Sequence, residues 1–274
     1  MTNLFNYIDR PSPIHDLTGA TKLVCLLLWS FAAMATYDTR LLAALALASF
    51  VLFRISRIGL RDVKFMLGFT AVFMVINNVL VYLFSPQHGT SIYGTVHVVL
   101  GSGRYALTQE QLFYHLYYFL KYLATIPIVL LFVCTTNPSE FAASLNTLGV
   151  KYSVAYSVAL ALRYIPDIQQ EYREISQAQQ ARGIEMSKKA SVIQRLRSAS
   201  SILIPLILSS MEKIEVVSNA MELRCFGKYK KRTWYMGRPF RTADILSMVC
   251  CALLVALSFW LNWKNGSRFY NPFI

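Results

Sequence analysis

An uncharged apolar run of 20 residues, FMLGFTAVFMVINNVLVYLF at 65–84, restricts the fold more than any other feature of the chain. A hydrocarbon core about 30 Å thick takes roughly 20 residues of α-helix to cross, and the backbone there must satisfy its own hydrogen bonds. Four further segments are similarly apolar, although two of them are a little short. The sequence therefore predicts an all-α, polytopic membrane protein with about five transmembrane helices, at 20–36, 40–57, 65–84, 119–136 and 242–263.

The charge balance fits a bilayer protein and predicts its orientation. Charged residues make up 15% of the chain, against roughly a quarter of an ordinary soluble protein. The net charge is +13, but a soluble nucleic-acid-binding protein would not also be 55% hydrophobic, so we expect no nucleic-acid partner. Lys and Arg are enriched in cytoplasmic segments of membrane proteins. Five spans with a cytoplasmic N-terminus place most of the basic residues on the cytoplasmic side, and we expect this orientation.

The basic middle of the chain contains two apolar stretches, 152–166 and 201–210, that are short for spans. If both crossed the bilayer, the basic segment between them would be extracellular, against the charge rule. We interpret them as parts of long amphipathic cytoplasmic helices that bend at Pro166 and Pro205. The expected organisation is four transmembrane helices in 1–136, with an extracellular loop at 85–110 that holds a short β-hairpin, then cytoplasmic helices in 137–240, then the last transmembrane helix and tail in 241–274.

The two long cytoplasmic helices are expected to end alike. The sequence SQAQQARG at 176–183 aligns with SNAMELRC at 218–225, 42 residues further on. One Arg near a helix C-terminus is explained by the helix dipole alone, but two copies favour docking. Small neighbours let a helix end enter a groove, while the guanidinium supplies a rigid fork of donors for carboxylates or carbonyls. The repeat therefore predicts two equivalent docking ends for a dimeric partner.

These endings resemble the paired Ala-Arg-Gly motifs of the transmembrane T component of energy-coupling factor (ECF) transporters, the prokaryotic importers of vitamins and metals. Ala181-Arg182-Gly183 fits the motif fully, and Leu223-Arg224-Cys225 keeps the Arg and a small successor. The segments at 14–17, 135–150 and 161–166 are similar to the family as well. The resemblance implies a non-catalytic scaffold of the prokaryotic cell membrane that has no cofactor or metal and whose cytoplasmic region holds coupling helices.

The resemblance also implies a partner for each part of that region. Two ATP-binding-cassette (ABC) ATPase subunits would bind the ATP and dock on the arginines, and a membrane-embedded S component would capture the vitamin or micronutrient. The implied ATPase-docking residues are Ala178, Ala181, Arg182, Gly183, Ala220, Arg224 and Cys225. The implied apolar and hinge residues toward the S component are Leu160, Leu162, Pro166, Ile204, Pro205, Leu206 and Leu208.

Three other classes of function stay open from the residues alone. An enzyme would need clustered catalytic groups, but the sequence contains no HExxH, GxSxG or P-loop motif, and its four His and five Cys lack metal-ligand spacing. A secondary carrier would use polar groups near the middle of the membrane, where Asn77-Asn78 is the obvious pair, although such residues also join helices. A membrane adaptor that binds anionic lipid would explain the basic surface but not the repeated Arg endings.

Overall fold

The computed structural model of the chain describes residues 10–101, 103, 105–184, 192–229, 233–234 and 237–265. The expected tail after 265 and the basic segment at 185–191 lie outside these residues. The described chain is helical apart from one two-stranded ribbon, so the predicted all-α class is confirmed. It divides into two compact units, one made of Met1–Asn137 with Arg238–Ile274 and the other of Pro138–Gly237.

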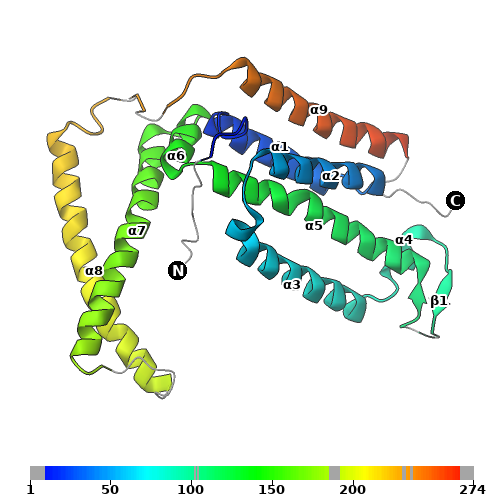
Figure 1. Cartoon of the computed structure of the whole chain (residues 1–274), viewed down its shortest axis with the longest axis horizontal. Helices are drawn as coiled ribbons and strands as arrows, with labels where there is room; N and C mark the ends of the chain where they lie inside the picture. Colours follow the sequence, from blue (N-terminus) through cyan, green and yellow to red (C-terminus); the bar gives the residue numbers. More distant parts are fainter. Residues whose placement is uncertain are drawn as a thin grey trace. The chain divides into compact units, whose positions relative to one another are not determined.

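The first unit is the apolar one. Its helices are α1 (Gly19–Ala35), α2 (Thr39–Ile55), α3 (Leu60–Phe84), α4 (His88–Tyr93), α5 (Gln109–Thr135) and α9 (Thr242–Lys264) (Figure 1). In the described part of the chain, three segments are long and apolar enough to cross a membrane: Val63–Phe84, Gln109–Thr135 and Thr242–Lys264. Helices α1 and α2 have 17 residues each, which is about 26 Å at the α-helical rise. The count of five spans stays a prediction.

Helix α5 packs against α1, α2, α3 and α4, and its proline is accommodated by neighbouring helices. Pro127 has no N–H, so the carbonyl of Leu123 lacks its helical donor. The Ser49 hydroxyl of α2 is shared between that carbonyl, at 3.0 Å, and Ala46 O of its own helix, at 2.8 Å. Trp29 Nε1 of α1 donates to the next carbonyl, that of Ala124, at 2.9 Å. An unpaired backbone carbonyl is costly in a bilayer, so these bonds let α5 continue through the proline.

Helices α1 and α9 pack together and share a capping group at their N-termini. Asp244 is buried, and its Oδ1 accepts hydrogen bonds from the backbone N–H of Thr18 at 2.9 Å and from the Thr18 hydroxyl at 3.2 Å. Its Oδ2 accepts from the backbone N–H of Arg241 at 2.8 Å. Thr18 is the N-cap of α1 and Arg241 the N-cap of α9. One carboxylate therefore satisfies N-terminal donors of two helices that are far apart in sequence.

The segment between α3 and α5 holds the expected β-hairpin and a helix that was not expected. Strand β1 (Val98–Leu100) pairs antiparallel with β2 (Leu107–Thr108), so the predicted hairpin is confirmed. The six-residue helix α4 precedes it and packs on α5. In the two helices that flank this segment, Asn78 Oδ1 of α3 lies 3.0 Å from His115 Nδ1 of α5. Asn78 thus joins two helices, which was the alternative to a carrier role for this residue.

The second unit contains α6 (Pro138–Thr147) and two long helices, α7 (Tyr152–Ala181) and α8 (Val192–Leu223). The long helices are antiparallel, because Gln179 near the end of α7 bonds to Ser201 early in α8, while Tyr156 near the start of α7 contacts Phe226 just beyond α8. Both remain helical through their prolines, Pro166 and Pro205. Figure 1 shows α8 changing direction part-way along its length.

Candidate docking sites on the second unit

The first candidate site is the C-terminal end of α7. Arg182 is the C-cap, and Gly183 follows it with a left-handed φ of +87°. The backbone N–H of Gly183 donates to Gln180 O at 3.0 Å, and that of Ile184 donates to Gln179 O at 3.1 Å. These two bonds define a Schellman ending, in which a left-handed residue turns the chain back and satisfies the last carbonyls of the helix. The fold therefore holds Arg182 on a defined turn and not on a frayed end.

The second candidate site, at the C-terminal end of α8, has the same hydrogen bonds 42 residues later. The backbone N–H of Cys225 donates to Glu222 O at 2.9 Å, and that of Phe226 donates to Met221 O at 2.9 Å. Cys225 adopts φ 55°, the left-handed conformation that Gly183 adopts in the first site. The equivalence predicted from the aligned sequences thus extends to the backbone bonds. We call these two structures the first tip (Ala178–Ile184) and the second tip (Ala220–Phe226).

The tips lie at opposite ends of the antiparallel pair. Lys213 Nζ of α8 lies 2.8 Å from Glu171 Oε2 of α7, and these residues are also 42 positions apart. Each tip arginine is about 11 residues beyond the member of this pair on its own helix, which is about 16 Å at the α-helical rise. The two helix segments that run from the Glu171–Lys213 pair to the tips are therefore of equal length and run in opposite directions. An antiparallel arrangement of this kind presents the same structure in two opposite directions.

All seven residues predicted for ATPase docking are exposed on the tips. The first tip exposes Ala178, Ala181, Arg182 and Gly183, and the second exposes Ala220, Arg224 and Cys225. The structure therefore brings each predicted set together in one place. In the described residues, no group of three or more His, Cys, Asp or Glu side chains could hold a metal ion.

The residues predicted to face an S component divide between exposed and half-buried positions. Pro166, Ile204 and Leu208 are exposed, whereas Leu160, Leu162, Pro205 and Leu206 are half-buried. The apolar surface of α8 extends beyond the predicted stretch, because Met211, Ile214 and Val216 are exposed as well. This surface was missed because the sequence after 210 also contains charged residues.

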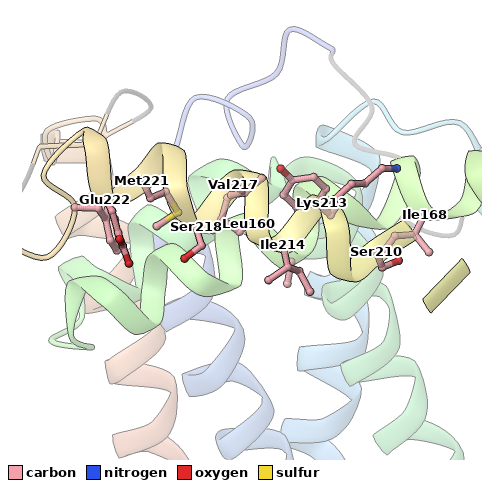
Figure 2. Close-up of a pocket in the computed structure, with 12 residues that line it drawn as sticks. Leu160, Ile168, Ser210, Lys213, Ile214, Val217, Ser218, Met221 and Glu222 are labelled. Atoms are coloured by element: carbon pink, nitrogen blue, oxygen red, sulfur yellow. The ribbon is translucent and has the colours of Figure 1, made fainter. Parts of the chain in front are cut away.

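A groove of about 550 Å³ runs between α7 and α8. Leu160, Ala161, Tyr164 and Ile168 line it from α7. Figure 2 shows Ile214, Val217 and Met221 following one another along α8 on the other side. These three residues are spaced three and four apart, which is the helical period that marks one face. That spacing was the signal in the sequence that could have identified the groove.

Among the described residues, Glu171 and Lys213 form an ion pair between the two helices. The Ser209 hydroxyl also donates to Glu171, on the other carboxylate oxygen. The hydrogen bonds from Lys213 and Ser209 lower the pKa of Glu171. The Glu171 carboxylate in turn raises the pKa of Lys213. Both groups are therefore charged at neutral pH and favour the antiparallel pairing.

Comparison with known proteins identifies the family. The family model described as CbiQ, cobalt transport protein, matches residues 10–235. This range includes both tips, the α7–α8 pair and most of the apolar unit. The chain belongs to this family.

Curated relatives agree along nearly the full length. The chain is 25% identical over 266 residues to the energy-coupling factor transporter transmembrane protein EcfT of Streptococcus thermophilus, covering 93% of this chain and 97% of that protein. Proteins of the same name from Listeria innocua and Bacillus subtilis are 24% and 25% identical, over 94% and 93% of this chain and 97% and 96% of their own lengths. The predicted resemblance to the T component is confirmed. The chain is a membrane protein and a transmembrane component of this class of transporter.

Proposed function

We propose that the chain is the scaffold and coupling subunit of an ECF-type ABC importer. In this role it catalyses no reaction and binds no cofactor. Two ABC ATPase subunits bind and hydrolyse ATP, and each docks on one tip. A membrane-embedded S component captures a vitamin or another micronutrient and rests on the apolar surface of the coupling helices. The N-terminus and the second unit lie on the cytoplasmic side of a prokaryotic cell membrane.

The observation that carries the ATPase part of the proposal is the repeated tip structure. Both arginines occupy the same position in the same pattern of backbone hydrogen bonds, and both are exposed. Two equivalent tips at opposite ends of the α7–α8 pair suit a two-fold partner, because each subunit of a dimer then meets an equivalent surface. A guanidinium can bind a carboxylate or carbonyls in a groove through several donors at once.

The docking proposal is tested by measuring ATPase binding to tip variants. Removing one partner of a buried, hydrogen-bonded charge pair typically costs roughly 2–5 kcal/mol of binding free energy. We expect Arg182→Ala and Arg224→Ala each to weaken co-purification of the ATPases, and the double variant to abolish both co-purification and transport. Arg173→Ala is the matched control, because Arg173 is an exposed arginine of α7 away from the tip. A double variant that transports normally would refute the docking role.

Exposed apolar side chains on α8 support the S-component part of the proposal. Ile204, Ile207 and Leu208 are 58%, 56% and 57% exposed, and apolar surface of this kind outside the bilayer marks protein or membrane contacts. We expect Ile204→Asn with Leu208→Asn to release the S component while leaving ATPase binding intact. Leu148→Asn, at a position 45% exposed after α6 and outside both long helices, is the control. Retention of the S component by the double variant would refute this assignment.

The cytoplasmic position of the second unit is tested by thiol labelling. Cys225 is exposed at the second tip. In cells that make the chain without its ATPase subunits, which would otherwise cover the tip, we expect a membrane-impermeant maleimide to label Cys225 in inside-out vesicles but not in intact cells, with Cys225→Ser as the control. Labelling of Cys225 in intact cells would reverse the orientation.

A further inference from the structure

An aromatic cluster packs around Phe226, the last residue of the second tip. We call it the aromatic clamp, and it consists of Tyr152, Tyr156, Phe226 and Trp234. The ring centroids of Phe226 and Tyr156 are 4.7 Å apart, and those of Phe226 and Tyr152 are 5.9 Å apart. Trp234 lies 5.3 Å from Tyr152 and 6.2 Å from Tyr156 by the same measure. These distances are those of interacting aromatic pairs.

Trp234 also fixes the clamp to the turn between α6 and α7. Its Nε1 donates to Asn146 Oδ1 at 3.0 Å. The amide nitrogen of Asn146 donates to the carbonyl of Val150 at 2.9 Å, and the N–H of Val150 donates to Leu145 O at 3.1 Å. Asn146 is thus bonded to both the turn and the indole. The direction of the indole ring is set by this bond as well as by ring packing.

The clamp bears directly on Arg224 through Phe226. Phe226 provides the N–H that closes the Schellman ending on Met221 O, and Arg224 is only two residues before it. Holding the Phe226 ring therefore holds the turn from which the Arg224 side chain extends. The equivalent residue of the first tip is Ile184, so the two tips differ at the position that the clamp grips.

We propose that Trp234 is a positioning residue for ATPase docking at the second tip. The inference rests on the proposed docking role of Arg224 and adds a device that acts on one tip only. The clamp keeps the second tip in its docking geometry before a partner binds, so less conformational freedom is lost on binding. The two ATPase sites are therefore similar in backbone structure but separately stabilised.

The experiment measures ATPase binding in two variants of the chain, each of which keeps the arginine of only one tip. In Arg182→Ala only the second tip retains its arginine, and in Arg224→Ala only the first does. We expect Trp234→Ala to weaken binding about tenfold in the Arg182→Ala background, the order of effect that aromatic packing produces, and to change it less than twofold in the Arg224→Ala background. Trp234→Phe keeps a ring and should restore most of the binding. Tyr172→Ala removes an exposed aromatic ring of α7 outside the clamp and serves as the control.

Hydrogen exchange reports the clamp independently of docking. Trp234→Ala should speed exchange at the Phe226 amide and leave exchange at the Ile184 amide unchanged. If Trp234→Ala weakens ATPase binding equally in both backgrounds, Trp234 has a general folding role and the inference is overturned. Normal ATPase binding together with normal exchange at Phe226 in Trp234→Ala would also overturn it. If Arg182→Ala and Arg224→Ala both bind normally, the docking proposal itself fails, and the inference fails with it.

Discussion

Substituting the left-handed residue of each tip, Gly183→Ala in the first and Cys225→Gly in the second, should change the stability of the two tips in opposite directions. Gly183 has φ +87°, and a residue with a Cβ there costs about 1–2 kcal/mol. The lower backbone entropy of alanine in the unfolded chain offsets about 0.5–1 kcal/mol of that cost. Gly183→Ala should therefore destabilise the first tip by about 1 kcal/mol, or roughly fivefold in the open population. Cys225 already bears this strain at φ 55°, so Cys225→Gly should stabilise the second tip by a similar amount.

Hydrogen exchange at two backbone amides measures both effects. The N–H groups of Ile184 and Phe226 close the two Schellman endings, so exchange should become about fivefold faster at Ile184 in Gly183→Ala and slower at Phe226 in Cys225→Gly. ATPase binding should be weaker in Gly183→Ala and stronger in Cys225→Gly, in each case by no more than about fivefold. Gly94→Ala is the control, because Gly94 has φ +72° after α4, outside the second unit.

Two results would refute this reasoning. Unchanged exchange at Ile184 in Gly183→Ala would mean that the left-handed turn does not hold the first tip. Weaker ATPase binding in Cys225→Gly, with slower exchange at Phe226, would mean that the thiol itself contacts the partner. The second result would separate backbone geometry from side-chain chemistry at the less typical motif.

Three further predictions concern the rest of the fold. Asp244→Ala removes the shared cap of α1 and α9 and leaves the buried N–H of Thr18 and the part-buried N–H of Arg241 unpaired. We expect a loss of about 3 kcal/mol, seen as a lower Tm in detergent, whereas Asp167→Ala at an exposed site should not change the Tm. Ser49→Ala leaves the Leu123 carbonyl without its donor and should cost about 1–3 kcal/mol in the same assay. Because the pKa of Glu171 is lowered, its contribution to α7–α8 pairing is present above the unfolded value of about 4.5 and is lost as pH falls through the lower folded value. Spin-label distances between α7 and α8 should therefore increase in acid, and Glu171→Gln should abolish that dependence.

The helices and their endings could be predicted from the sequence because their signals are local. Apolar length marked α3, α5 and α9, and Gly149 and Gly183 marked the ends of the helices before them. The alignment of 176–183 with 218–225 predicted equivalent tips. It could not predict that Cys225 would adopt the left-handed conformation, because cysteine has no preference for it.

Other features depend on residues far apart in the chain and had no local signal. Ser49 satisfies a carbonyl that Pro127 leaves unpaired, 74 residues from Leu123. Trp234 bonds to Asn146, 88 residues before it. Such pairs form only when tertiary packing brings their elements together. The signal that could have been used for Trp234 was weaker: it is a large aromatic residue in a connecting segment rich in charged side chains.

The equal distances from the Glu171–Lys213 pair to the two tips have a mechanical consequence for the proposed coupling role. Each tip arginine is about 16 Å from the Glu171–Lys213 pair along its own helix, and the helices run in opposite directions. A rotation of about 10° of one helix against the other about this pair would therefore move the tips relative to each other by about 3 Å at that rise. Partners that approach or separate at the tips would thereby change the interhelical angle, and the apolar surface of α8 would move with it. An ion pair near the centre resists sliding more than rotation, because its charges stay close when the helices turn about it.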